Sequence, residues 1–331
     1  MEEHVENSYY FLLRGNNEYL ALGELKALLE VYTGGNRVNC FTMLCIARTK
    51  SEVVVEIIER SGFLKEAGVV IGVFDAYSEQ DARETGRLVG KNPVHVSILK
   101  STISEESVNR FIEVGGIEVG FRGRGEYRLF FTDGRAVLAR KLFEKDYGVL
   151  LKKARSRPFQ RSIALKPDIA RALVNLTRAK RGDLLIDPFT GTGTILLEAW
   201  DMGVLGLGVE IDYELVVGFK ANVLYSKAPI IPVISDSSEI VFREVDRIAT
   251  DLPYGRGAST HGVEIKKLYE SFTQRLQEYL SRNGYACFMT PLWLEDYVDE
   301  LISQYGFKLT ERYYDYVHGQ LTRVINVVRK Q

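Results

Sequence analysis

The segment IDPFTGTGTILLEA (186–199) constrains the fold of this chain more than any other stretch. A short apolar run is followed by a glycine-rich turn and then by a helix-forming stretch. Gly191 and Gly193 lack a Cβ, so the backbone of the turn can approach a ligand closely. The helix that follows would present unpaired N–H groups to that ligand. The segment therefore predicts a strand, turn and helix of a doubly wound α/β domain, with a ligand at the turn.

The rest of the second half repeats this alternation. Short apolar runs typical of strands lie at 183–188, 206–212, 229–236, 245–251 and 284–291, and helical patterns lie at 169–179, 194–202, 213–225 and 264–282. Such alternation predicts a mostly parallel sheet. The chain then ends in two β-rich runs, 307–319 and 320–330, joined by a tight turn at His318 and Gly319. We therefore expect a Rossmann-like α/β domain over residues 166–331, with an antiparallel hairpin at the edge of its sheet.

The first half has a different pattern, which is typical of an α+β region. Runs with strand character lie at 8–15, 41–48, 53–58 and 68–77, and helical patterns lie at 18–32, 78–90 and 101–116. Ser78 is expected to cap the second of these helices. Residues 126–142 read as a β-hairpin around Asp133 and Gly134. We divide this half into an N-terminal segment, 1–60, and a second domain, 61–150.

Basic residues are concentrated between the two halves. The whole chain has a formal net charge of −1, but residues 135–166 contain ten lysines and arginines against two acidic residues. The segment FRGRGEYR (121–128), just before this run, contains three more arginines. One interpretation is a solvated linker, which we place at 151–165; the other is a surface for a phosphate backbone. The candidate RNA-binding residues are Arg122, Arg124, Lys152, Lys153, Arg155 and Arg157.

Other classes of protein are disfavoured by composition. Cys40 and Cys45 are too far apart for a CxxC pair, and no second pair follows, so no metal site is expected. Three cysteines in all fit a reducing compartment. The acidic N-terminus does not resemble a signal peptide, and no apolar run approaches 18 residues. We therefore expect a cytoplasmic protein that has no membrane partner.

Acidic residues at three predicted strand ends indicate which cofactor the turn would hold. The dinucleotide pattern GxGxxG is absent, because Leu196 stands where the third glycine belongs. Asp187 precedes the turn, where it would repel a pyrophosphate but attract the cationic amino-acid end of S-adenosylmethionine (SAM). Glu210 is placed to accept hydrogen bonds from ribose hydroxyls. Asp236 could accept one from the adenine amine, or it could be a helix cap among the neighbouring serines.

The motif TDLPYG (250–255) follows another strand and predicts a site for an amine acceptor. An exocyclic amine of a base is a poor nucleophile, because its lone pair is delocalised into the ring. Asp251 and the carbonyl of Leu252 could hold the amine with that lone pair directed at a methyl group, and Pro253 would stiffen the backbone. Tyr254 offers a face on which a base taken out of its stack can lie. The alternative is an ordinary turn after a strand.

The two motifs, in this order and spacing, resemble the signatures of class I SAM-dependent amino-methyltransferases. The usual acceptor motif is D/N-P-P-Y/F, and Leu252 departs from it. RPFQRSIALKPDIARALVNL (157–176) resembles the segment that leads into the catalytic domain of the THUMP-containing tRNA guanosine N2-methyltransferases, and YDYVHGQLTRVINVVRK resembles their closing hairpin. Residues 61–150 are similar to a THUMP domain, which a ferredoxin-like segment precedes in that family.

This resemblance implies transfer of a methyl group from SAM to a guanosine amine of tRNA at position 10, giving N2-methylguanosine and N2,N2-dimethylguanosine. It also implies a monomer, alone or with a small activator protein. The implied catalytic residues are Asp251, Pro253 and Tyr254. The implied cofactor-binding residues are Lys166, Pro167, Asp187, Phe189, Gly191, Gly193, Thr194, Glu210 and Asp236.

Two other functions compete with this interpretation. An adenine N6-methyltransferase acting on RNA or DNA would need the same acceptor motif, although the THUMP-like half argues against it. A non-catalytic RNA-binding protein could retain a decayed methyltransferase fold. The acidic residues of the cofactor and acceptor motifs are all intact, which argues against decay.

Overall fold

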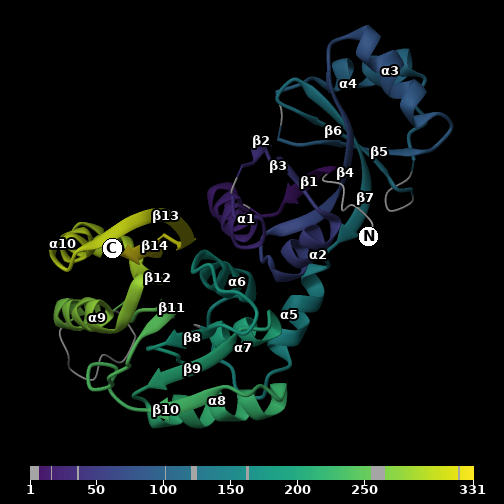
Figure 1. The fold of residues 1–331 in the computed structure, drawn as a ribbon. Coiled ribbons are helices and arrows are strands. Elements are labelled where there is room, and N and C mark those ends of the chain that lie inside the picture. Colours follow the sequence, from purple (N-terminus) through teal and green to yellow (C-terminus); the bar gives the residue numbers. More distant parts are fainter. Residues whose placement is uncertain are drawn as a thin grey trace, which may run out of the picture. The chain divides into compact units, whose positions relative to one another are not determined.

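The computed structural model describes residues 7–15, 17–35, 37–100, 102–120, 125–161, 164–254, 265–319 and 321–331. The chain forms two compact units (Figure 1). Unit 1 comprises residues 1–18, 32–59 and 63–146, and unit 2 comprises residues 19–31, 60–62 and 147–331. No helix within these described ranges is long and apolar enough to cross a membrane.

Unit 1 is built on a mixed seven-stranded sheet of order β2-β3-β1-β4-β7-β6-β5, in which only β5 and β6 pair in parallel. Its strands are β1 (Asn7–Leu13), β2 (Asn39–Phe41), β3 (Leu44–Thr49), β4 (Leu64–Asp75), β5 (Val94–Ile98), β6 (Tyr127–Thr132) and β7 (Arg135–Glu144). Its helices are α2 (Ser51–Arg60), α3 (Glu79–Val89) and α4 (Glu105–Gly115). Because this one sheet runs through both predicted segments, 1–60 and 61–150, their separation stays a prediction.

Some of the local sequence patterns in unit 1 predicted the structure correctly and one did not. Asp133 and Gly134 both have positive φ, 47° and 72°, as a two-residue hairpin turn requires, so the predicted hairpin is confirmed. The Ser78 side chain caps α3, as expected. The expected strand at 53–58 is wrong, because these residues form part of α2. Val54 and Ile58 lie four residues apart and are both buried, so helical spacing outweighed the β-branched composition.

A disulfide joins Cys40 and Cys45, which face each other across the β2–β3 hairpin. The cysteine count alone did not predict this pair, and a disulfide argues against an ordinary reducing compartment. Disulfides do persist inside the cells of hyperthermophiles. Cys287 is buried and unpaired.

Unit 2 contains the predicted α/β domain. Its sheet has the order β10-β9-β8-β11-β12-β14-β13, parallel from β10 to β12, with β14 and β13 antiparallel at the edge. The strands are β8 (Leu184–Asp187), β9 (Leu205–Glu210), β10 (Ile231–Ile234), β11 (Val245–Asp251), β12 (Leu280–Pro291), β13 (Phe307–His318) and β14 (Leu321–Lys330). The mostly parallel sheet with its edge hairpin is therefore confirmed.

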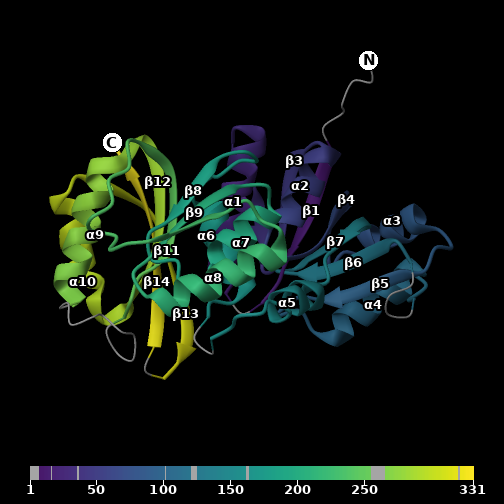
Figure 2. The ribbon, with the colours of Figure 1, turned by 90° about the horizontal axis from the view of Figure 1, so that it is seen from below.

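Helices cover both faces of this sheet. They are α5 (Tyr147–Arg155), α6 (Pro167–Leu176), α7 (Thr194–Asp201), α8 (Tyr213–Ser226), α9 (Ile265–Tyr279) and α10 (Glu295–Gln304). Figure 2 shows α9 and α10 on one face and α6 and α7 on the other. The core under α9 and α10 includes Ile248, Leu276 and Phe288. Helix α5 and helix α10 were not predicted, and α5 occupies part of the expected linker at 151–165.

Helix α1 (Glu18–Thr33) also contributes to unit 2, although it was predicted within the N-terminal segment. Its Glu24 is fully buried and accepts hydrogen bonds from the Asn175 side chain and the Gly62 amide, both at 2.8 Å. A Cβ on Gly23 would lie 2.0 Å from the hydroxyl of Tyr313 on β13, so only glycine allows this approach. The chain therefore enters unit 2 for α1, again at residues 60–62, and then from residue 147 onward.

Candidate active site

Acidic residues of the predicted cofactor and acceptor sites lie together at the carboxyl ends of the parallel strands of the unit 2 sheet. Asp187 is the last residue of β8, Glu210 the last of β9 and Asp251 the last of β11. The chain runs outward from β8 to β10 on one side and from β11 to β12 on the other. The sheet order therefore reverses between β8 and β11, which is where ligands of doubly wound folds bind.

Asp187 is buried, with 1% of its surface exposed. Its Oδ1 accepts hydrogen bonds from Thr250 Oγ1 at 2.7 Å and from the Phe189 amide at 3.1 Å. Its Oδ2 is buried without a hydrogen-bond partner among the described residues. The pKa of Asp187 is raised to about 7, mainly by burial and to a lesser degree by the nearby Asp251 and Glu210, while the hydrogen bonds from Thr250 and Phe189 oppose the rise. An unpaired buried carboxylate oxygen costs free energy, which a cationic ligand would recover.

The glycine turn is shaped as its sequence predicts. Gly191 has φ 56° and open space where a Cβ would be, whereas a Cβ on Gly193 would lie 2.1 Å from the ring of Phe219. Gly193 caps α7, which begins at Thr194. Glu210 holds the turn: its Oε2 accepts from the Gly191 amide at 2.8 Å, and its Oε1 accepts from the next two backbone amides at 3.0 Å each. A carboxylate has lone pairs beyond these three bonds, so ribose binding by Glu210 stays a prediction.

The remaining predicted cofactor residues are less engaged. Oδ1 of Asp236 accepts from the amide and the hydroxyl of Ser238, each at 2.8 Å, so it caps a local turn and not a helix, which was the alternative considered. Phe189 packs against the core beneath α9. Lys166 is exposed and caps α6 without a side-chain hydrogen bond, and Pro167 is the buried first residue of that helix. Cofactor contact by these residues stays a prediction.

The acceptor motif forms a hydrogen-bonded cluster. The Tyr254 hydroxyl donates to Asp251 Oδ1. The guanidinium of Arg323, on β14, lies 6.0 Å from the centroid of the Tyr254 ring and 3.5 Å from Oδ2 of Asp315. Burial raises the pKa of Asp251 to about 6, against the opposing effects of Arg323 and the Tyr254 hydrogen bond. Asp251 is thus a carboxylate at neutral pH, with a cation and a hydroxyl beside it.

Leu252, which departs from the usual acceptor motif, has a structural role. Its side chain is 2% exposed and belongs to the core beneath α9. Its amide donates to the carbonyl of Met289 at 3.3 Å, which extends the β11–β12 pairing beyond Asp251. A proline has no N–H and could not make this bond. The next carbonyl, that of Pro253, accepts from the Tyr269 hydroxyl at 3.0 Å, so the motif is held at both ends.

Four residues of this site were not singled out from the sequence: Thr250, Tyr269, Asp315 and Arg323. Thr250 stands beside the acceptor motif, but nothing in the motif indicates its bond to Asp187. Arg323 and Asp315 lie in the closing hairpin, sixty or more residues beyond the motif. Their position depends on the pairing of β13, β14 and β12, which no local pattern reveals.

Comparison with known proteins supports this geometry. The model of the RMKL-like methyltransferase domain family matches residues 154–324. The tRNA (guanine(10)-N2)-dimethyltransferase of Pyrococcus abyssi is 30% identical over 97% of this chain and 99% of its own length. The chain belongs to this family. The enzyme of the same name from Methanothermobacter thermautotrophicus is 37% identical over 61% of this chain, an alignment that spans 58% of the relative.

The fold of this family member also resembles solved structures. TrmN from Thermus thermophilus is 20% identical, has a TM-score of 0.55, and matches 98% of this chain and 100% of its own. At this identity the likeness supports the fold alone. The match to the family model begins at residue 154, so the ferredoxin-like and THUMP assignments of residues 1–60 and 61–150 stay predictions.

The predicted RNA-binding residues divide into four groups. Lys152 and Arg155 are exposed on the last turn of α5. Lys153 is exposed but pairs with Asp201 at 2.6 Å. The prediction for Arg157 is wrong: its side chain is buried and its Nη2 lies 2.6 Å from Glu198, so it is not available to a phosphate. Arg122 and Arg124 lie outside the described residues.

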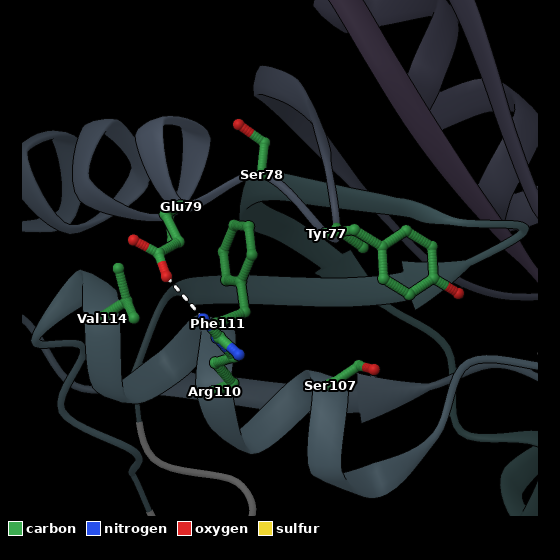
Figure 3. A pocket seen from close by; sticks show the side chains of 9 residues that line it. Tyr77, Ser78, Glu79, Ser107, Arg110, Phe111 and Val114 are labelled. Carbon is green, nitrogen blue, oxygen red and sulfur yellow. Dashed lines mark hydrogen bonds and ion pairs between the residues drawn. The ribbon is translucent and has the colours of Figure 1, made fainter.

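Unit 1 contains a pocket of about 400 Å³ between the start of α3 and helix α4 (Figure 3). The only two charged side chains that line it, Glu79 and Arg110, pair with each other at 2.7 Å. The pocket therefore offers neither a free charge nor a nucleophile activated by a base. In the described part of the chain, no three histidines, cysteines or acidic residues gather as metal ligands.

Proposed function

We propose that this protein transfers methyl groups from SAM to the N2 amine of guanosine 10 in tRNA, forming first N2-methylguanosine and then N2,N2-dimethylguanosine. The observation that carries the proposal is the pair of carboxylates at the ends of adjacent central strands, of which Asp187 is buried and Asp251 partly buried. Asp187 has an oxygen without a partner, which suits a cationic cofactor, and Asp251 is bound to Tyr254, which suits an amine acceptor. The substrate follows from full-length relatives that carry this name.

The residues around the glycine turn are suited to hold SAM. Asp187 Oδ2 would accept from the ammonium group of its methionine end, and the open space at Gly191 lets the cofactor reach the backbone. Glu210 would bind the ribose, and Asp236 would contact the adenine. Bound there, SAM supplies an electrophilic methyl group on a sulfonium.

Asp251 would hold the amine of the flipped base with its lone pair toward that methyl group. Its pKa near 6 keeps it ionised at neutral pH and basic enough to take the proton that the methylated amine releases. Tyr254 fixes the carboxylate through its hydroxyl, and its ring would support the base. Tyr269 holds the carbonyl of Pro253 and so limits movement of the motif. Because methyl transfer is a direct displacement, positioning of the amine and the methyl group is the main contribution that a rigid site can make.

The proposal extends to the state of the protein. We infer that it acts as a monomer in the cytoplasm, where tRNA is processed, alone or with a small activator protein. The disulfide of the β2–β3 hairpin then implies a cytoplasm in which disulfides persist. Light scattering of the purified protein with and without tRNA tests the monomer; a mass of two chains would contradict it.

The decisive experiment is incubation with labelled SAM and tRNA transcripts that carry guanosine or adenosine at position 10, followed by nucleoside analysis. We expect mono- and dimethylated guanosine from the first transcript and no labelled nucleoside from the second. Asp251→Asn should abolish transfer while SAM binding persists. Asp246→Asn is the matched control, because Asp246 is exposed at the other end of β11. Methylated adenosine would favour an adenine N6-methyltransferase. Binding of tRNA without methyl transfer would favour a non-catalytic RNA-binding protein.

A further inference from the structure

Arg323 is a largely buried cation with unused hydrogen-bonding capacity. Its side chain is 12% exposed, and its Nε is buried without a hydrogen-bond partner among the described residues. Buried donors are normally paired, so an unpaired one beside the predicted acceptor site indicates a missing acceptor. Nη1 lies 3.5 Å from Asp315, its partner in the β13–β14 register, and the guanidinium also contacts the ring of Tyr254.

The strand register directs Arg323 toward the acceptor site. Asp251 pairs with Met289 on β12, and Met289 pairs with Ile325 on β14. Residues paired across a sheet point to the same face, and so do residues two apart on one strand. Arg323 is two residues from Ile325, so it shares a face with Asp251. The contact of Arg323 with Tyr254, whose hydroxyl binds Asp251, agrees with this placement.

The site therefore presents an acceptor, Asp251, and beside it an unsatisfied donor, Arg323. The edge of guanine that carries its N2 amine reads donor, donor, acceptor: the amine, the N1–H and the O6 carbonyl. Resting on the proposed function, we propose that Arg323 is the specificity-determining residue that donates a hydrogen bond to guanine O6 while Asp251 accepts from the amine and N1–H. Adenine lacks both the N1–H and the carbonyl, so it would leave Arg323 unpaired and bring the N1 lone pair toward the carboxylate.

This assignment accounts for a choice that the acceptor motif cannot make. The carboxylate of Asp251 would accept from any amino-bearing base. A buried donor that loses its partner discriminates strongly, because the analogue must leave that donor desolvated and unpaired. The preference for guanine would then come from the closing hairpin and not from the motif itself.

The test compares two bases at position 10 of the tRNA: guanosine and 6-thioguanosine. The thio base keeps the amine and the N1–H but replaces O6 with sulfur, a weak acceptor. Initial rates of methyl transfer give kcat/KM for the wild type, Arg323→Met and Arg323→Lys on both tRNAs. Arg329→Met is the matched control, since Arg329 lies at the other end of β14 and binds Asn283. Retained SAM binding by each variant shows that its cofactor site is folded.

We expect the wild type to prefer guanosine by about 10- to 100-fold, the range for a hydrogen bond to a charged group. Arg323→Met should lower kcat/KM for the guanosine tRNA by a similar factor, and it should react with the two tRNAs at nearly equal rates. Arg323→Lys should keep part of the preference, because its ammonium still donates. Arg329→Met should keep all of it.

Failure of the inference and failure of the proposed function give different results. If the wild type discriminates and Arg323→Met discriminates equally, Arg323 has only a structural role and the inference is overturned while the proposed function stands. If the wild type reacts equally with both bases, O6 is not recognised; the inference is then overturned and the proposed function stands. If the wild type modifies neither tRNA, the proposed function fails, and the inference fails with it.

Discussion

Replacing Asp251 with asparagine is expected to stabilise the protein while abolishing its activity. Burial raises the pKa of Asp251 from its usual 3.8 to about 6, even though Arg323 and Tyr254 favour the charged form. The folded state therefore binds this proton more tightly than the unfolded state does. Above pH 6 the ionised carboxylate lowers the free energy of unfolding by about 3 kcal/mol. Asparagine has nearly the same shape and can still accept from Tyr254, but it carries no charge to desolvate.

The pH dependence of this effect has a definite sign. Between pH 3.8 and about 6, folded Asp251 is protonated and unfolded Asp251 is ionised, so wild-type stability falls as pH rises through this window. The advantage of Asp251→Asn should be greatest at pH 8 and should shrink steadily as pH falls from 6 toward 4. Urea unfolding of both proteins without cofactor, at several pH values, measures it. A variant that is no more stable than the wild type at pH 8 would refute the reasoning.

Three further outcomes are expected. Leu252→Pro removes one backbone hydrogen bond and part of a buried side chain, so it should lower the free energy of unfolding by about 1–3 kcal/mol, measured by denaturant titration. The variant should still transfer methyl groups, and a variant of full stability without activity would contradict this. Glutamate at both Lys152 and Arg155 should weaken tRNA binding and flatten its salt dependence, and unchanged binding would make α5 a simple connector. SAM binding should release a proton near pH 7 as Asp187 ionises, seen calorimetrically in buffers of different ionisation enthalpy; equal heats would exclude it.

The structure changes the interpretation of the basic residues between 135 and 166, because not all of them are available to bind RNA. Charge counting treated Arg157 and Lys152 alike, since both lie in one long positive stretch. In the folded protein, Arg157 and Arg171 enclose the buried Glu198, with N–O distances of 2.6 and 2.8 Å. Sequence reports how many charges a segment has, but which of them face water depends on partners far along the chain.

What the sequence by itself determined lies within short stretches. The glycine turn, the acids that end β8, β9 and β11, and the closing hairpin are local patterns, because backbone geometry and strand ends depend on neighbouring residues. Tertiary structure alone decided that α1 joins unit 2, that Thr250 bonds to Asp187, and that Arg323 faces Asp251. Each of these joins residues that are distant in the chain. Such contacts follow from strand order and register, and those are selected by the packing of the whole core.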